Sequence, residues 1–317
     1  GDASYRRYFR LISKKKTKIL VYAAKEKYKN LIAYTAINQF LKKKGIVTPK
    51  LFKYDFKLGV LIIEDFGNKT FQKILLKKKY KLSTYKKLVD LLVRIQKIKP
   101  PKKINTLIKN KKHIFKKYNI ENLHKESDLF FDWYLPLFFN TKKILKIKSK
   151  TKKILSKIYK KLYFKNSHFV HRDYHASNLM KLDKGIGVID TQDSLVGNPA
   201  YDLVSLIDDV RIKTSQKLKK CIFQYYLTRA TRIYQNKPKE FLQDFNILSV
   251  QRSLKILGIF ARLFARDKKK QYLKLIPYTW NLLELRLKDK KFYELRLILN
   301  KTVSSKIRKK IITNENK

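Results

Sequence analysis

The hydrophobic positions at the start of the chain occur in short runs that predict a small β-sheet. Residues 5–12 (YRRYFRLI) and 18–23 (KILVYA) are rich in β-branched and aromatic side chains and predict two paired strands. The runs LFKYDF and VLIIEDF predict two more strands, joined by a hairpin-like turn that ends at Gly59. Between these pairs, apolar residues recur at helical spacing over residues 28–44, and Gly45 follows as a helix stop.

After Gly67 the apolar positions recur mainly at helical spacing, which predicts a larger, mostly helical part. One segment differs, because residues 169–193, FVHRDYHASNLMKLDKGIGVIDTQD, carry short β-like runs around polar turns. We therefore predict an α+β fold with two lobes, an antiparallel sheet plus helix over residues 1–66 and a mainly α-helical lobe over 67–317. The helices predicted in the second lobe are 83–98, 107–118, 126–139, 141–164, 202–211, 214–235, 239–266, 268–287 and 291–311.

The composition is that of a folded protein without disulfides. The chain has 317 residues, of which 44% are hydrophobic and 13% aromatic, enough apolar surface to offset the entropy of the chain. Cys221 is the single cysteine, so neither an intramolecular disulfide nor a cysteine-based zinc site can form. No run approaches the ~20 apolar residues of a membrane span, and no secretory signal pattern is present. We expect a cytoplasmic protein.

The net charge of +53 allows two interpretations. Clustered basic residues would bind nucleic acid or an anionic surface, because they release counterions from phosphates. Here 63 lysines outnumber 14 arginines and are spread along the chain, and Ile, Asn, Tyr and Phe are also abundant. These residues share A/T-rich codons, so a compositional drift explains the whole pattern, and we favour it. A protein that binds nucleic acid or an anionic surface is the alternative.

The segment HFVHRDYHASNLM offers three interpretations. His171 and His175 have the i, i+4 spacing of a zinc pair, but no Glu follows His171 as in a metalloprotease helix. They could instead be ordinary buried histidines that bond to the backbone. The third interpretation adds Asp173 and Asn178, five residues apart, and Asp190 at the end of a later β-like run. A phosphoryl-transfer site needs such a carboxylate for the attacking hydroxyl and such oxygen ligands for Mg²⁺.

HRDYHASN resembles the catalytic loop of the protein-kinase-like superfamily. It is closer to the aminoglycoside phosphotransferase and choline kinase branch than to protein kinases, which usually carry Lys where His175 stands. GVIDTQD stands where those enzymes have the aspartate that binds Mg²⁺, and its Thr191-Gln192 departs from the Phe-Gly of protein kinases.

Five blocks, from Gly1 to about Leu297, further resemble the bacterial kinases of cell-wall amino sugars, which phosphorylate N-acetylmuramate and N-acetylglucosamine at the anomeric hydroxyl. The blocks are GDASYRRYFRL, LIIEDFG, HRDYHASNLM, GVIDTQDSLVGNPAYDLVSLIDDVR and QRSLKILGIFARLFARDKKKQYLKLIP. The resemblance implies a two-lobed protein-kinase-like fold, a nucleotide-binding lobe at 1–66, ATP and Mg²⁺ as cofactors, and a role in peptidoglycan recycling. Because Gly1 already belongs to a motif, we expect residues upstream of it. An aminoglycoside or another alcohol is the alternative acceptor.

The resemblance also assigns roles to single residues. Asp173 would be the base or the carboxylate that orients the attacking hydroxyl. His175 would contact the γ-phosphate, and Asn178 and Asp190 would ligate Mg²⁺. Two further sets follow from the family blocks: Glu64, Asp65 and Phe66 as the hinge that meets adenine, and Gly1, Asp2, Ala3 and Ser4 as the turn over the phosphates.

One expected residue is missing. Kinase-like proteins usually hold the α- and β-phosphates with a lysine on the third strand, but KILVYA has Tyr22 where that lysine would stand. Since alternate residues of a strand point to opposite faces, Arg6 or Arg7 could replace it. Because this lysine is missing, a catalytically inactive protein with a kinase-like fold is an alternative. Asp202 would brace the catalytic loop, or else be an ordinary carboxylate at a helix start.

The predicted partners are ATP and a small-molecule sugar acceptor, with no specific nucleic acid and no membrane. Asp193, three residues after the metal aspartate, is a candidate acceptor contact. The segment ESDLFFDWYL also resembles the family, and its Glu126, Asp132 or Trp133 could reach a sugar by hydrogen bonding or stacking. Alternatively, the aromatic residues of this segment are the core of a helix packing.

Overall fold

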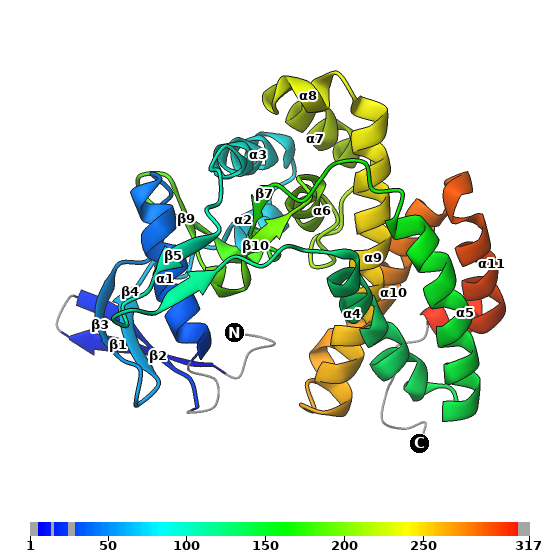
Figure 1. Cartoon of the computed structure of the whole chain (residues 1–317), viewed down its shortest axis with the longest axis horizontal. Coiled ribbons are helices and arrows are strands. Elements are labelled where there is room, and N and C mark those ends of the chain that lie inside the picture. Colours follow the sequence, from blue (N-terminus) through cyan, green and yellow to red (C-terminus); the bar gives the residue numbers. More distant parts are fainter. Residues whose placement is uncertain (1–5, 14–15, 25–28, 310–317) are drawn as a thin grey trace. The chain divides into compact units, whose positions relative to one another are not determined.

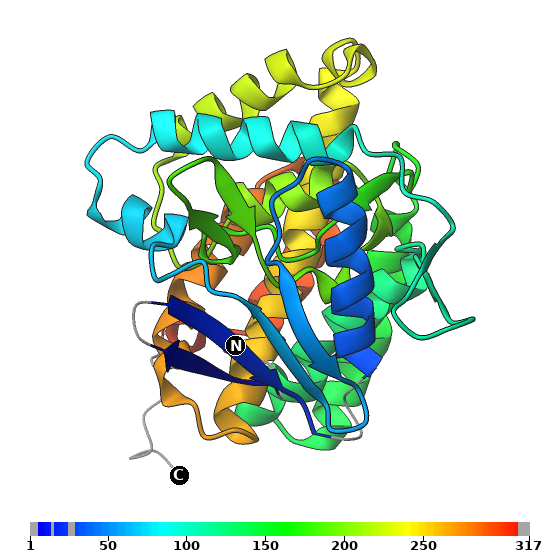
Figure 2. The ribbon, with the colours of Figure 1, turned by 90° about the vertical axis from the view of Figure 1, so that its left-hand side faces the viewer.

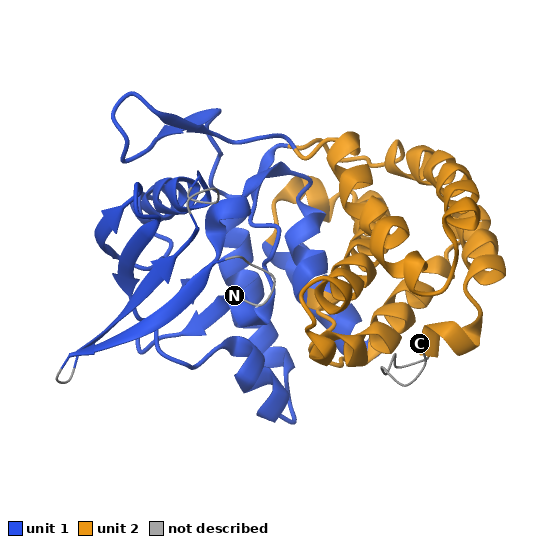
Figure 3. Cartoon of the chain, turned by 90° about the horizontal axis from the view of Figure 1, so that it is seen from below, with its two compact units in different colours: residues 1–117, 167–206, 217–229 blue, residues 118–166, 207–216, 230–317 orange. Residues whose placement is uncertain are grey.

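The computed structural model describes residues 6–13, 16–24 and 29–309. These residues form an α+β fold that divides into two compact units (Figure 3). Unit 1 comprises residues 1–117, 167–206 and 217–229, and unit 2 comprises residues 118–166, 207–216 and 230–317. Each unit is thus built from segments that are far apart in the sequence. The predicted lobe boundary between residues 66 and 67 stays a prediction.

Unit 1 contains a four-stranded antiparallel sheet with the strand order β1-β2-β4-β3. The apolar residues Val21, Leu61 and Ile63 lie on one face of the sheet and pack against Leu31 and Tyr34 of helix α1, which runs beside the strands in Figure 2. The alternation in the sequence therefore gives the expected strands, and the helical spacing gives the expected helix. Their bounds are β1 Arg7–Ser13, β2 Lys16–Tyr22, β3 Leu51–Asp55, β4 Val60–Glu64 and α1 Lys29–Lys43.

The β-like segment predicted inside the helical part is confirmed as two short antiparallel pairs in unit 1. Strand β7, His168–Val170, pairs with β10, Leu195–Gly197, which the sequence analysis did not predict. Strand β8, Leu179–Lys181, pairs with β9, Ile186–Val188. The two pairs carry the candidate catalytic residues at their ends.

The prediction of a helix over residues 107–118 is wrong. The chain forms a hairpin there, in which β5, Lys103–Asn105, pairs with β6, Lys112–Ile114. Asn110 has a φ of 59°, and the Thr106 N–H donates to the Lys111 carbonyl at 3.1 Å. Because a left-handed residue cannot continue an α-helix, the chain turns where the apolar spacing predicted another helical turn.

In the described part of unit 1 the chain forms four further α-helices, and one of them was not predicted. Helix α2 is a short helix that the Thr70 side chain caps by accepting the Lys73 N–H at 3.2 Å. The helix predicted over residues 83–98 is confirmed as α3. The helix predicted over residues 214–235 is divided, and its first part is α7. The bounds are α2 Phe71–Lys77, α3 Leu82–Gln96, α6 Ala200–Ile207 and α7 Gln216–Arg229.

The described part of unit 2 is helical and is organised around the long helix α9, Pro238–Ala265 (Figure 1). Gly258 of α9 lies so close to helix α4 that a Cβ atom there would be 2.2 Å from the Leu129 carbonyl carbon. After α4 the chain forms a π-helical turn, Phe130–Tyr134, whose Tyr134 hydroxyl accepts a hydrogen bond from the Trp280 indole at 2.9 Å. The other helices are α4 Ile120–Leu129, α5 Thr141–Tyr159, α8 Arg232–Gln235, α10 Ile276–Leu287, α11 Tyr293–Thr302 and α12 Ser305–Lys309.

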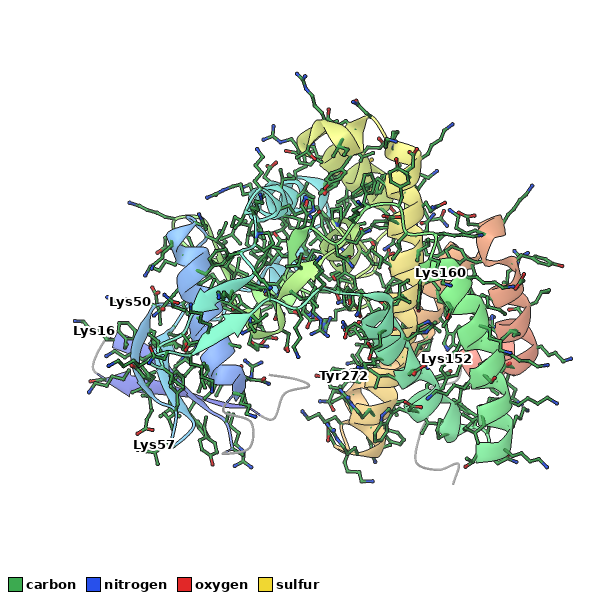
Figure 4. All side chains as sticks on the ribbon, viewed as in Figure 1. Lys16, Lys50, Lys57, Lys152, Lys160 and Tyr272 are labelled. Atoms are coloured by element: carbon green, nitrogen blue, oxygen red, sulfur yellow. The ribbon has the colours of Figure 1, made fainter. Side chains whose placement is uncertain are left out.

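The basic side chains project from many elements of both units (Figure 4). Lys16, Lys50 and Lys57 are exposed around the sheet of unit 1, and Lys160 is exposed at the end of α5 in unit 2. Basic side chains therefore lie on elements of both units, and the origin of the charge stays a prediction. Within the described residues, no helix is long and apolar enough to cross a membrane.

Candidate active site

A buried aspartate holds the loop between β7 and β8. The Asp202 side chain is fully buried at the start of α6, and its carboxylate accepts the N–H groups of His171 at 2.7 Å and Arg172 at 3.0 Å. Arg172 has a φ of 72°, the left-handed region that is unfavourable for a residue with a Cβ atom. The two charge-assisted hydrogen bonds stabilise this turn and so orient Asp173, the next residue. The predicted bracing role of Asp202 is confirmed.

His171 joins the same loop to the end of β9. Its Nδ1 accepts the Asp173 N–H at 3.3 Å, so Nε2 carries the proton and donates to the Ile189 carbonyl at 2.9 Å. The ring is therefore part of the scaffold. Among the described residues no group of three or more His, Cys, Asp and Glu side chains could hold a metal ion, so the zinc interpretation gains no support.

The backbone places the two predicted metal ligands next to each other. The Asn178 side-chain nitrogen donates to the Asp173 carbonyl at 3.0 Å, and the Ile189 N–H donates to the Asn178 carbonyl at 3.1 Å. The second bond fixes Asn178 beside the residue that precedes Asp190. An amide oxygen and a carboxylate are hard oxygen donors, which suit Mg²⁺ when phosphate oxygens and water complete its six ligands. The residues present therefore fit the expected ion.

Arg6, the residue before β1, reaches this pair. Its guanidinium is buried and donates to Asp190 Oδ1 at 2.6 Å and to Gln192 Oε1 at 2.8 Å. Gln192 in turn donates from Nε2 to Asp190 Oδ1 at 3.1 Å and to Asp193 Oδ2 at 2.9 Å. Burial lowers the pKa of Arg6, but Tyr8 and Asp190 raise it by more, so the guanidinium stays charged. The sequence analysis named Arg6 as a phosphate-binding candidate but did not predict its contact with Asp190.

The strand that would carry the kinase lysine offers no cation toward the core. Val21 on β2 is 2% exposed and belongs to the core, whereas its neighbour Tyr22 is 39% exposed. Residues that alternate with Val21, such as Ile19 and Thr17, share its face, and none of them is basic. Arg7 is the first residue of β1 and is exposed, whereas Arg6, just before the strand, is buried. Of these two arginines, Arg6 is the one directed to the site.

The hinge candidates lie at the end of β4. The exposed Glu64 carboxylate accepts the Lys50 N–H at 3.0 Å. Asp65 accepts two hydrogen bonds from Arg10, at 2.6 and 3.0 Å. Burial raises the pKa of Asp65, but the hydrogen bonds from Arg10 and the Gly67 N–H outweigh it and leave this pKa lowered.

The Phe66 ring packs against the backbone of Gly187 in β9. A Cβ atom at position 187 would lie 2.6 Å from the ring, so a glycine is required there. The hinge candidate Phe66 thus contacts the β8–β9 hairpin, whose second strand leads to Asp190. The predicted phosphate turn Gly1, Asp2, Ala3 and Ser4 lies outside the described residues.

Two further predicted residues lie in the same loops. His175 is buried, and its Nδ1 is 2.7 Å from the Ser177 hydroxyl. Asp193 is about half-exposed, and its carboxylate is 3.9 Å from the Arg172 guanidinium. The sequence analysis missed Arg172 and Gln192 as parts of this site, although both stand next to residues that it singled out.

The acceptor candidates Glu126, Asp132 and Trp133 belong to unit 2. Glu126 is buried, and its carboxylate is engaged within that unit by the Tyr118 hydroxyl, by Gln251 Nε2 at 3.1 Å and by Lys255 Nζ at 3.0 Å. Asp132 is exposed and pairs with Lys148 at 2.6 Å, and Trp133 is half-buried. The aromatic-core interpretation holds for three fully buried neighbours: Phe130, Phe131 and Tyr134.

Residues 1–235 match the model of the phosphotransferase enzyme family, APH. The chain belongs to this family and is therefore an ATP-dependent small-molecule phosphotransferase, as the predicted loop residues indicated.

Two relatives are similar over most of their length. An N-acetylmuramate/N-acetylglucosamine kinase of Pseudomonas aeruginosa is 28% identical over 90% of this chain and 81% of its own. The kinase of the same name from Neisseria meningitidis is 27% identical over 89% of this chain and 83% of its own.

Solved structures of the same fold bind other molecules. The choline kinase LicA from Streptococcus pneumoniae has a TM-score of 0.58 at 13% identity, with 90% of this chain and 89% of that chain covered. The gentamicin complex of APH(2")-IIa has a TM-score of 0.59 at 13% identity, with 92% and 90% covered. At this identity the likeness shows the fold, a kinase-like arrangement of an N-terminal antiparallel sheet followed by a mainly helical part.

Proposed function

We propose that this phosphotransferase phosphorylates the anomeric hydroxyl of a cell-wall amino sugar, N-acetylmuramate or N-acetylglucosamine, with MgATP as donor. The observation that carries the reaction is the loop in which Asp202 orients Asp173 beside Asn178 and Asp190. The sugar is supported by the relatives of that name, which are similar along about nine-tenths of the chain. The product would enter the recycling of peptidoglycan sugars.

In this proposal Asp173 accepts or orients the proton of the attacking hydroxyl. Hydrogen bonds engage the N–H of the preceding residue Arg172 and both the N–H and the carbonyl of Asp173, so the backbone that carries the carboxylate is held in place before the acceptor binds. Asn178 and Asp190 hold Mg²⁺, which supplies positive charge against the β- and γ-phosphates when MgATP is bound. His175 lies in the same loop and contacts the γ-phosphate.

Arg6 takes the place of the absent strand lysine and neutralises phosphate charge. Its guanidinium already lies at the metal aspartate, and it remains charged at neutral pH. Asp65 and Phe66 form the hinge for adenine, with Arg10 and Gly187 as their supports. Together these residues give the nucleotide a base contact and a phosphate contact.

For the acceptor we propose Asp193 as the nearest contact. Gln192 holds one of its carboxylate oxygens, while about half of the side chain stays exposed for a sugar hydroxyl. Asp132 and Trp133 of unit 2 remain proposals for further sugar contacts. Glu126 is the weakest of the acceptor candidates, because three partners within unit 2 already engage its carboxylate.

The test is a ³¹P NMR assay of the protein with ATP, Mg²⁺ and each candidate acceptor. A sugar 1-phosphate should appear with N-acetylmuramate or N-acetylglucosamine. Asp173→Asn should bind nucleotide as the wild type does and lose about 10²–10⁴-fold in rate. Asp183→Asn, a matched change at an exposed aspartate in the β8–β9 turn, should keep the rate.

The same panel separates the alternatives. Phosphorylation of an aminoglycoside or of choline, with no amino-sugar product, would reject the proposed substrate and retain the enzyme class. If no acceptor consumes ATP, or if Asp173→Asn keeps the wild-type rate, the assignment of Asp173 to the reaction is refuted.

A further inference from the structure

One of the two carboxylate oxygens of Asp190, the predicted metal ligand, is engaged by two donors in this structure. Asp190 Oδ1 accepts the Arg6 guanidinium at 2.6 Å and the Gln192 amide at 3.1 Å. The Arg6 side chain is 7% exposed, so this ion pair is shielded from solvent on the arginine side. A charge-assisted hydrogen bond of this length is among the stronger kinds in proteins.

A free divalent cation would gain little at this place. The loop offers Asn178, which is neutral, and Asp190, whose charge Arg6 balances. Nowhere in the described part of the chain do three or more acidic, histidine or cysteine side chains gather as a set that could hold a metal ion. Mg²⁺ requires about six oxygen ligands and gives up its water reluctantly. The cation would also approach a guanidinium of the same sign.

A bound nucleotide changes both the charge balance at Asp190 and the number of oxygen ligands available to a metal ion. Its phosphates offer Arg6 an anion with more charge than one carboxylate and offer the metal several more oxygen ligands. In the sequence, Arg6 belongs to the same family block, GDASYRRYFRL, as the motif that we assign to the phosphates. Gln192 would keep its bonds to Asp190 and Asp193 after Arg6 has left.

We infer that Arg6 guards the metal ligand Asp190 until nucleotide is bound. The guanidinium excludes free divalent cations from Asp190, and the phosphates of the nucleotide release Asp190 by taking over Arg6. Metal therefore enters the site with the nucleotide and not before it. This inference rests on the proposed Mg²⁺ role of Asp190 and adds the order in which metal and nucleotide bind.

The experiment titrates the full chain with Mn²⁺, as a paramagnetic substitute for Mg²⁺, and measures free Mn²⁺ by electron paramagnetic resonance without nucleotide. Arg6→Gln should bind Mn²⁺ at least tenfold more tightly than the wild type, a difference of about 1.4 kcal/mol. Arg7→Gln removes the same charge from the neighbouring, exposed residue and should leave the Mn²⁺ affinity at the wild-type value. Arg6→Met keeps an unbranched apolar stem in the buried place and repeats the test independently.

A second arm adds a non-hydrolysable ATP analogue. The wild type should then bind Mn²⁺ and the analogue together, whereas Arg6→Gln should lose at least tenfold in affinity for the analogue. Asp190→Asn in the Arg6→Gln background should abolish the gain in Mn²⁺ affinity. This result would show that the additional Mn²⁺ binds at Asp190. The inference is overturned if both Arg6 variants bind free Mn²⁺ no more tightly than the wild type, or if Arg7→Gln shows the same gain.

These results are independent of the sugar. Failure of the proposed function would appear as the absence of amino-sugar phosphorylation in a protein that still binds the ATP analogue. Failure of the present inference would appear as unchanged Mn²⁺ affinity in an enzyme that still phosphorylates its sugar.

Discussion

The two hydrogen bonds of the Asp202 carboxylate predict how much activity and stability its replacement by Asn should cost. The wild-type carboxylate accepts the His171 N–H at 2.7 Å and the Arg172 N–H at 3.0 Å. In Asp202→Asn the amide oxygen can accept only one of these groups, and the amide N–H₂ group faces the other. The loss of a hydrogen bond to a charged group costs about 1.5–3 kcal/mol, and a buried unpaired N–H adds about 1–3 kcal/mol. Arg172, at a φ of 72°, then relaxes from its left-handed conformation and displaces Asp173.

We expect kcat to fall roughly 10²-fold, because a displacement of ~1 Å of a reacting group has that effect. The KM for ATP should change little, since Asp202 contacts the catalytic loop and not the hinge. Steady-state kinetics with the amino sugar measure both constants. Thermal unfolding measures the accompanying loss of stability.

Asp244→Asn is the matched control. Asp244 in unit 2 is equally buried and likewise accepts two consecutive N–H groups, of Tyr163 at 2.8 Å and Phe164 at 2.9 Å. This variant should lose comparable stability while the folded fraction keeps its kcat. If the two variants lose kcat equally, or if Asp202→Asn keeps it, the argument that Asp202 acts by orienting Asp173 is refuted.

Three further predictions concern packing and pH. Gly187→Val should raise the KM for ATP, because the new side chain would displace Phe66. The control Gly185→Ala lies at a φ of 86° with open space around it, so it should cost about 1–2 kcal/mol of stability and leave this KM unchanged. Equal KM values in the two variants would contradict the contact between Phe66 and Gly187. Gly258→Ala should lower the unfolding temperature, as calorimetry would show, because its Cβ atom would overlap the Leu129 backbone at 2.2 Å; an unchanged temperature would contradict so close a crossing. Burial above all lowers the pKa of three histidines, His113, His124 and His168. As the pH falls, the unfolded chain therefore binds protons at these histidines before the folded protein does. Denaturant titrations should show that the stability from the neutral histidines is fully present above about pH 6.5 and is lost as the pH falls from there through their lower pKa values in the folded protein. Replacing all three histidines by Gln should flatten this pH dependence.

The fold could be predicted where periodicity is strong. Alternation gave the strands of the sheet, and helical spacing gave α1, α3 and α9 close to their bounds. It failed at residues 107–118, where the local conformation of Asn110 reverses the chain between apolar residues that were spaced for a helix. It also did not predict β10, Leu195–Gly197.

The candidate site could be predicted where its residues are close in sequence. Asp173, Asn178 and Asp190 stand on one short segment, so their spacing carries information. The contact of Arg6 with Asp190 joins residues 184 positions apart, and no local pattern records such a distance. The contacts of Glu126 are equally distant, because its partners Gln251 and Lys255 lie 125 and 129 residues further on, and its assignment to the acceptor stays a prediction.

The division of unit 1 into three segments has a consequence for synthesis. The sheet and α1 leave the ribosome first, but Thr191, which bonds to Asn38 of α1 at 2.7 Å, follows after the whole segment 118–166 of unit 2. Until Thr191 has been synthesised, the face of α1 that it contacts therefore stays uncovered. Contacts between residues so far apart in the sequence also form slowly. Translation speed through residues 118–206 and access to chaperones thus become determinants of how much active enzyme a cell obtains.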